Sequence, residues 1–197
     1  MQSIEKKVLE KILKIKRGIL LFPEDFHALG SSEAIRLALH RLEKEKVIKR
    51  VAQGIYVRPI TSQYIGEVLP SAEDVAKGIA KRDRIRIVPT GVYALNALGL
   101  STQVPMKLVF LTDGAARIIR IGKRTIKFKK TTPKNLMAKG EISSLVIQAL
   151  REIGINKATE VEEKKIIELL KKENPKDLMQ DIKLAPVWIQ KIMQKAL

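Results

Sequence analysis

The sequence contains no cysteine, which excludes disulfide bonds and thiolate chemistry. This absence is typical of a reducing compartment, and we expect a cytoplasmic protein. Histidine is almost as scarce, with only His27 and His40 among the 197 residues. They are too far apart for an i, i+4 metal pair, and no HExxH, P-loop or GxSxG motif is present. We therefore expect no enzyme activity, no metal site and no cofactor.

Long apolar runs and clustered aromatic residues are also missing. No run approaches the roughly 20 apolar residues that cross a bilayer, and the N-terminus lacks the apolar core of a signal peptide. We expect no membrane partner. Aromatic residues make up 4% of the chain. Without a paired aromatic signature on strands, binding of single-stranded RNA by base stacking is disfavoured.

Positive charge is what the sequence has in excess, with 38 Lys and Arg against 21 Asp and Glu, a formal net charge of +17. Such a field favours polyanionic partners. Residues 1–60 hold 13 basic and 7 acidic residues, residues 61–150 hold 15 and 6, and residues 151–197 hold 10 and 8. The middle of the chain is therefore its most basic part.

The segment SSEAIRLALHRLEKEK, which begins at Ser31, predicts an amphipathic helix. Its apolar residues recur every three or four positions, which places on one face Ile35, Ala38, Leu39 and Leu42. Ser31 or Ser32 can cap its start. The other face carries long donors that a DNA groove could receive, although most charged helix faces are simply solvated.

The surrounding elements favour the DNA-binding interpretation. Upstream are a helix at SIEKKVLEKILK, a short apolar strand, and a helix from Pro23 to Gly30. Downstream, VIKRVAQGIYVRP predicts two strands joined at Ala52, Gln53 and Gly54. This order is that of a winged helix-turn-helix. The candidate DNA-binding residues are Ser32, Arg36, His40, Arg41, Lys44, Lys49, Arg50, Gln53 and Arg58.

A second domain is expected after a linker. Residues 1–60 form the expected winged-helix domain, the proline-bearing segment 61–72 the linker, and residues 73–197 a small α+β domain that ends in helices. In this domain we expect a helix from a Thr90 cap to Gly99, strands at KLVFLTD, ARIIRIG and RTIKFKK, and a hairpin turn at Gly122 and Lys123. Asp113, in LTDG, is expected in a turn rather than in catalysis. The whole chain is thus expected to be of the α+β class.

A basic patch lies in residues 114–140, a stretch without any acidic residue. In TIKFKK, Ile126 and Phe128 alternate with cationic residues, so the strand would gather cations on one side for phosphate. The helix start expected at Thr132 and Pro133 would suit an anion, or would be a plain helix cap. The patch comprises Arg117, Arg120, Lys123, Arg124, Lys127, Lys129, Lys130 and Lys134.

Several segments together resemble the AbiEi-type antitoxins of type IV toxin–antitoxin systems. The resemblance is carried by MQSIEKKVLEKI, GIYVRP, TGVYALNALGLSTQVP, VFLTDG, IRIG, TTPKN, LVIQALREIG and LAPVWI. It implies a winged-helix domain that represses the protein's own operon, an antitoxin domain, and a nucleotidyltransferase toxin as functional partner. Positions carried over from it are Arg36, His40, Arg41, Arg50, Gly54 and Tyr56, none of them catalytic.

We accordingly expect a regulator that binds double-stranded DNA. Its operator is expected to consist of inverted repeats, bound by a homodimer. The alternative is an RNA-binding or ribonucleoprotein partner that uses the basic sheet.

Overall fold

A computed structural model describes residues 3–64 and 66–197, and the protein is of the expected α+β class. Met1 and Gln2 of the expected N-terminal domain, and Ile65 of the expected linker, lie outside the described residues. The chain divides into two compact units. Unit 1 comprises Met1–Gly78 with Arg120–Gly122, and unit 2 comprises Ile79–Ile119 with Lys123–Leu197.

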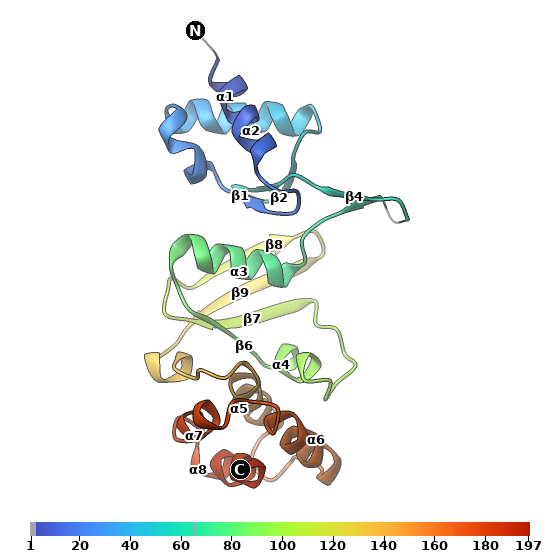
Figure 1. The fold of residues 1–197 in the computed structure, drawn as a ribbon, viewed down its shortest axis with the longest axis vertical. Helices are drawn as coiled ribbons and strands as arrows, with labels where there is room; N and C mark the ends of the chain where they lie inside the picture. The colour runs from blue at the N-terminus through green and yellow to red at the C-terminus, as the bar shows by residue number, and fades with distance from the viewer. Residues whose placement is uncertain (1–2, 65) are drawn as a thin grey trace. The chain divides into compact units, whose positions relative to one another are not determined.

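Unit 1 is built from helices over a small sheet, and in Figure 1 its helices α1 and α2 are blue. Its core contains Val8 and Ile12 from the first helix and the apolar stripe of the second. The elements are α1 (Ile4–Lys14), β1 (Leu20–Leu21), η1 (Pro23–Leu29), α2 (Ser32–Lys44), β2 (Lys49–Ala52), β3 (Ile55–Val57), β4 (Ile60–Ser62) and β5 (Gly66–Val68), and α3 (Ala72–Asp83) begins here.

The helix predicted from Ser31 is α2, and its cap and its apolar stripe are confirmed. The Ser31 hydroxyl accepts a hydrogen bond from the backbone N–H of Ala34 at 3.3 Å, which satisfies one of the free donors at the helix start. The four predicted core residues, Ile35, Ala38, Leu39 and Leu42, are buried. The opposite face of α2 is therefore left to solvent or to a partner.

The helix predicted from Pro23 to Gly30 is present as η1, and it is a 3₁₀ helix. Its start is held by Asp25, whose carboxylate accepts the backbone N–H of Phe22 at 2.8 Å. Gly30 ends it as expected, and a Cβ at this position would lie 2.7 Å from Cδ1 of Ile4. A side chain at this position would therefore displace the end of the Ile4 side chain of α1.

The predicted hairpin is present as β2 and β3, with the turn at Gln53 and Gly54. Gly54 has φ +69°, in the left-handed region that glycine enters without strain. The sheet order is β1-β3-β2, so β3 lies between the hairpin partner and the short strand before η1. The order of helices and strands up to β3 is therefore as predicted.

The segment predicted as a linker, residues 61–72, includes most of a second hairpin. Strands β4 and β5 pair in antiparallel fashion, with Ile60 opposite Val68 and Ser62 opposite Gly66. The division between the two units falls later, inside α3.

Unit 2 contains a four-stranded mixed sheet of order β6-β7-β9-β8. Its central strands β7 and β9 are parallel, with Phe110 opposite Phe128, and β6 is antiparallel to β7. The three predicted strands and the turn at Gly122 and Lys123 are confirmed. The elements are β6 (Ile87–Thr90), α4 (Val92–Ala97), β7 (Lys107–Thr112), β8 (Arg117–Ile121), β9 (Arg124–Lys130) and η2 (Pro133–Leu136).

The predicted Thr90 cap is wrong. Thr90 is the last residue of β6, where it pairs with Val109, and the residue that caps α4 is Gly91 with φ +64°. The strand thus continues one residue further than the helix pattern indicated, and only glycine turns easily at the junction.

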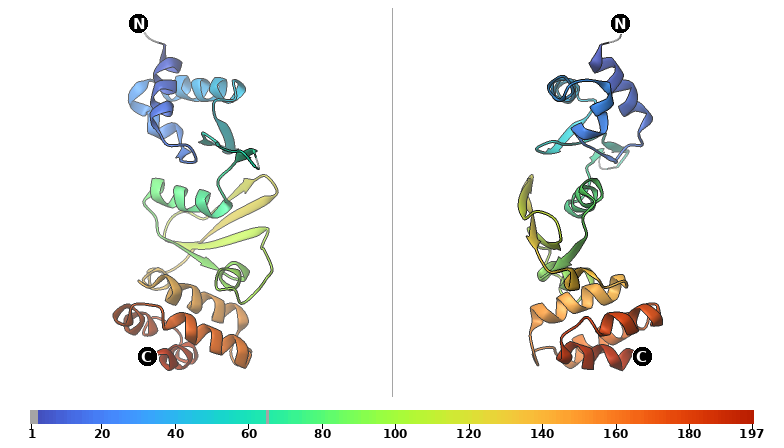
Figure 2. Two further views of the ribbon diagram at one scale, coloured as in Figure 1. Left: turned by 45° about the vertical axis from the view of Figure 1, so that its right-hand side comes forward. Right: turned by 90° about the vertical axis from the view of Figure 1, so that its left-hand side faces the viewer.

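The predicted helical tail is confirmed, and its helices share one hydrophobic core with α4, to which Ala94 and Leu98 contribute. Figures 1 and 2 show its helices, orange to red, gathered side by side. None of the helices in the described residues combines the length and apolar character needed to cross a membrane. The elements are α5 (Glu141–Ile153), α6 (Glu160–Leu170), α7 (Pro175–Ile182), α8 (Val187–Met193) and η3 (Gln194–Ala196).

Candidate nucleic-acid interface

The exposed face of α2 is a line of side chains opposite its buried stripe. With 3.6 residues per turn, Glu33, Leu37, His40 and Lys44 follow one another along the middle of this face, and Arg36 lies to one side of it. Leu37 is 51% exposed although it is apolar. The face therefore offers both cationic donors and an apolar contact, which are the two kinds of group that read base edges.

The predicted contact residues of α2 differ in whether their charges are already paired. Arg41 donates from Nη1 to Oε2 of Glu5 in α1 at 3.0 Å. His40 Nδ1 lies 3.7 Å from a carboxylate oxygen of Glu43, which is an ion pair only when the imidazole is protonated. Arg36 and Lys44 are exposed and have no hydrogen bond or ion pair within the described chain. These two cations are the ones available to a ligand.

In the hairpin β2–β3 and the residue after it, some predicted contact residues are likewise already paired and others are not. Lys49 forms an ion pair with Glu67 of β5, so its charge is partly neutralised within unit 1. Arg58 donates to the backbone oxygen of Leu13 at 3.2 Å and so fastens the chain after β3 to the end of α1. Arg50 and Gln53 are exposed, without a partner in the part of unit 1 that the structure describes. Ser32 is also exposed, at the first turn of α2.

Sequence reasoning missed the hairpin β4–β5 as part of this surface. Tyr64, which follows β4, is 93% exposed. Glu67 on β5 reaches Lys49 of β2, so the two hairpins are tied together by an ion pair. In the sequence, the feature that could have indicated this hairpin is Tyr64, a large aromatic residue in a segment rich in small and polar residues.

In unit 2 the predicted alternation of β9 is confirmed. Ile126 and Phe128 are buried, while Lys127 and Lys129 point to the other side of the sheet and are at least partly exposed. Arg117 does not join them, because its guanidinium pairs with Asp83 and lies 5.3 Å from the centre of the Phe128 ring. The other predicted patch residues are exposed, namely Lys123, Arg124, Lys130 and Lys134 in unit 2, and Arg120 in the short segment that belongs to unit 1.

A depression of about 560 Å³ borders the side of the sheet on which Lys127 lies. Val109 of β7, which pairs with Lys127, lines it together with Lys107, Met106 and Val104. Two of these side chains, Val104 and Met106, are apolar and more than half exposed. Sequence reasoning missed this depression because the segment before β7 has no periodicity.

Asp113 has the turn position that the sequence predicts. Its carboxylate accepts hydrogen bonds from the backbone N–H of Arg86 at 2.8 Å and from Nε of Arg86 at 3.0 Å. These bonds lower the pKa of the Asp113 carboxyl below its ordinary value, the backbone bond first. The carboxylate thus joins the start of β6 to the end of β7.

The expected helix start at Thr132 and Pro133 is a 3₁₀ helix of four residues, and the Thr132 side chain makes no capping hydrogen bond. An element this short has almost no macrodipole. The expectation that its N-terminus would attract an anion has therefore no support from the helix itself.

These features define an α+β protein with a basic helix-and-hairpin surface in one unit and a basic mixed sheet in the other. The chain belongs to DUF6088, a family of unknown function whose model matches residues 7–178, from α1 into α7. The match includes parts of both units, so the helix-and-hairpin surface and the mixed sheet belong to one family unit. No curated protein matches the chain.

Proposed function

We propose that the protein is a regulator that binds double-stranded DNA in the cytoplasm, with unit 1 acting as a winged helix-turn-helix. In this proposal α2 enters the major groove and the β2–β3 hairpin lies along the phosphate backbone. The observation that carries it is the exposed face of α2, where Arg36 and Lys44 project without a partner in the described chain. The net charge of +17 supports the same partner class.

The interface residues divide by role in this proposal. Arg36, with its forked guanidinium, suits a bidentate contact to guanine, whereas Arg50 on the hairpin suits a phosphate. Arg41 and Lys49 contribute less, because Glu5 and Glu67 already pair with them. Two protomers on an inverted repeat would double the few base contacts that one α2 helix makes.

The test is binding of the DNA upstream of the protein's own gene, compared with a scrambled duplex at the same salt concentration. Arg36→Ala should weaken binding to the upstream DNA by about 5- to 150-fold, equivalent to about 1 to 3 kcal/mol, and reduce the preference for it over the scrambled duplex. Arg50→Ala should weaken binding to both duplexes alike.

Lys171→Ala provides the control, because Lys171 is an exposed cation of unit 2, outside the proposed interface. It should leave the affinity for both duplexes close to that of the wild type. An equal loss on upstream and scrambled DNA for Arg36→Ala would contradict the assignment of Arg36 to base reading.

The antitoxin part of the proposal rests on the resemblance to AbiEi-type proteins. The chain would repress its own operon and counter a nucleotidyltransferase toxin encoded beside it. Co-expression of the two genes tests this directly: cells that stop growing with the neighbouring gene alone should grow when the chain is added. Continued arrest would remove the antitoxin role and leave the DNA-binding role standing.

A second candidate is RNA binding through the sheet of unit 2. It is favoured by Lys127 and Lys129, which lie on one side of β9. Lys127 pairs with Val109 of β7, which lines the depression together with Lys107. Cations spaced along a strand can follow a phosphate backbone. Retention of cellular RNA by the wild type, lost on joint replacement of Lys127 and Lys129 by Gln, would support this candidate.

A further inference from the structure

Arg151 of α5 is a partly buried guanidinium without a carboxylate partner in the described chain. Its Nη1 donates to Oδ1 of Asn135 at 3.0 Å. Burial lowers the pKa of Arg151, and no neighbouring charge counters this effect. Removing a charge from water is costly unless a counter-charge or several hydrogen bonds replace the lost hydration. A single neutral amide replaces little of it.

The neighbouring amide groups are set to receive a further ligand. Asn135 donates from Nδ2 to Oγ1 of Thr131 at 2.8 Å, which directs its oxygen toward Arg151. Gln148 lies one helical turn before Arg151 on α5 and is 4% exposed, yet its side-chain amide has no hydrogen bond within the described residues. Buried amides nearly always have a partner. The Gln148 amide is not among the fully buried polar atoms without a partner, so its oxygen and nitrogen stay open to a ligand or to water at the cavity.

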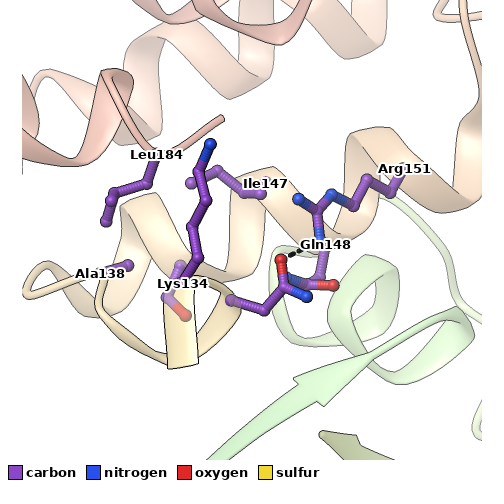
Figure 3. Close-up of a pocket in the computed structure, with 8 residues that line it drawn as sticks. Lys134, Ala138, Ile147, Gln148, Arg151 and Leu184 are labelled. Carbon is purple, nitrogen blue, oxygen red and sulfur yellow. Dashed lines mark hydrogen bonds between the residues drawn. The ribbon is translucent and has the colours of Figure 1, made fainter. Parts of the chain in front are cut away.

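The two side chains open on one small cavity. Its volume is about 10 Å³, room for about one water molecule or one oxygen atom of a larger ligand. Figure 3 shows Gln148 and the guanidinium of Arg151 close together on one side, and Lys134 on the other. Lys134 is exposed and has no ion-pair partner among the described residues. Its long side chain can bring a second positive charge to the mouth of the cavity.

We propose that Arg151, Gln148 and Lys134 form a binding site for one phosphate group, with one of its oxygens entering the cavity. The guanidinium supplies several donors in a planar fork and the Gln148 amide supplies two more, which suits the oxygens of a phosphate. Water could hydrogen-bond to Gln148 but would leave the partly buried charge of Arg151 without a counter-ion. The site lies within unit 2 and does not depend on DNA binding by α2.

Calorimetric titration with inorganic phosphate, at constant ionic strength with chloride, tests the site. Arg151→Met keeps much of the side-chain volume and removes the charge, so it should weaken phosphate binding by about 10- to 100-fold, the value of a hydrogen bond to a charged group. Lys134→Gln should weaken it by a smaller factor. Because Lys134 is exposed, this variant preserves the fold even if Arg151→Met unfolds. Lys172→Gln, at an exposed lysine after α6, should leave binding unchanged.

Two further probes distinguish the possible sources of the phosphate. Adenosine 5′-monophosphate that binds more tightly than inorganic phosphate would indicate a small phosphate compound. A 5′-phosphorylated single-stranded oligonucleotide that binds more tightly than both would indicate a nucleic-acid strand. The proposal is overturned if none of the three probes binds, or if Lys134→Gln and Lys172→Gln bind phosphate equally well.

Discussion

Two carboxylates hold the start of α5, the helix that carries Arg151. Asp181 is fully buried and accepts the backbone N–H groups of Lys139 and Gly140 at 2.9 and 2.8 Å. Glu173 accepts those of Ile142 and Ser143 at 2.8 and 3.1 Å. Four backbone donors at the helix start and just before it are thus satisfied by side chains more than 25 residues away. The negative charges also suit the positive end of the helix dipole.

Replacement of Asp181 by Asn should lower the free energy of unfolding by about 1.5 to 3 kcal/mol. An amide offers only one accepting oxygen, so one of the two buried N–H groups would lose its partner. Urea unfolding at neutral pH measures the change. Asp177→Asn, in the same helix and without a hydrogen bond to backbone donors among the described residues, is the matched control and should cost less than about 0.5 kcal/mol. Equal losses in the two variants would show that Asp181 does not hold this turn.

Asp83 should make stability depend on pH in the acid range. Burial raises the pKa of its carboxyl, but hydrogen bonds and charges from Arg82 and Arg117 outweigh this, so the pKa lies below its ordinary value of 3.8. Because the folded-state pKa is the lower one, the stabilisation is present above about pH 4 and is lost as pH falls through the folded-state value. Asp83→Asn should therefore destabilise the protein at about pH 7 and much less at about pH 2.

Urea unfolding of the wild type and of Asp83→Asn at several pH values measures this difference. The difference in unfolding free energy between the wild type and Arg117→Gln should also become smaller at low pH, because Arg117 is a partner that lowers the pKa of Asp83. A difference between wild type and Asp83→Asn that stays constant over the whole range would refute the linkage.

At the scale of elements, the two hairpins of unit 1 are coupled by the ion pair between Lys49 and Glu67. If the β2–β3 hairpin lies on the DNA backbone, the ion pair with Glu67 weakens the attraction of Lys49 to the DNA phosphates. Glu67→Gln should then tighten binding to any duplex several-fold and steepen the dependence of log affinity on log salt by up to about 0.9. Glu160→Gln, which removes an exposed carboxylate of unit 2, is the control. An unchanged salt dependence in Glu67→Gln would place this hairpin outside the interface.

Elements that depend on local periodicity were predictable from the sequence, as were the charged faces that alternate with buried ones. The stripe of α2 and the alternation of Ile126 and Phe128 in β9 are examples, because each side chain's burial follows from its own position. Partner choice between distant segments was not predictable. Nothing near Arg117 or Lys49 in the chain indicates Asp83 or Glu67 as partners, since sheet order and helix packing bring these residues together.

The hydrogen-bond pattern of the helix before α2 was also not predictable from the sequence. Pro23 and Gly30 mark a helix, but their spacing does not distinguish an α-helix from the 3₁₀ helix that forms between them. Similarly, Tyr64 and its polar neighbours read as a linker because two strands of three residues are too short to show alternation.

At the scale of the whole molecule, the open question is whether the basic sheet and the α2 surface act on one duplex. We expect separate functions, because unit 1 by itself carries the unpaired cations of the proposed DNA-binding surface, while Lys127 pairs with Val109, which lines a depression in unit 2. Joint replacement of Arg120, Arg124, Lys127 and Lys129 by Gln should then leave the slope of log affinity against log salt nearly unchanged on upstream DNA. Growth rescue by co-expression, or retention of RNA, should be lost in the same variant.

If the sheet shares the duplex with α2, the slope should instead become shallower by about 0.9 for each lost phosphate contact. An unchanged slope together with intact rescue and intact RNA retention would mean that these cations are only solvated, because solvent screens exposed charges that have no partner.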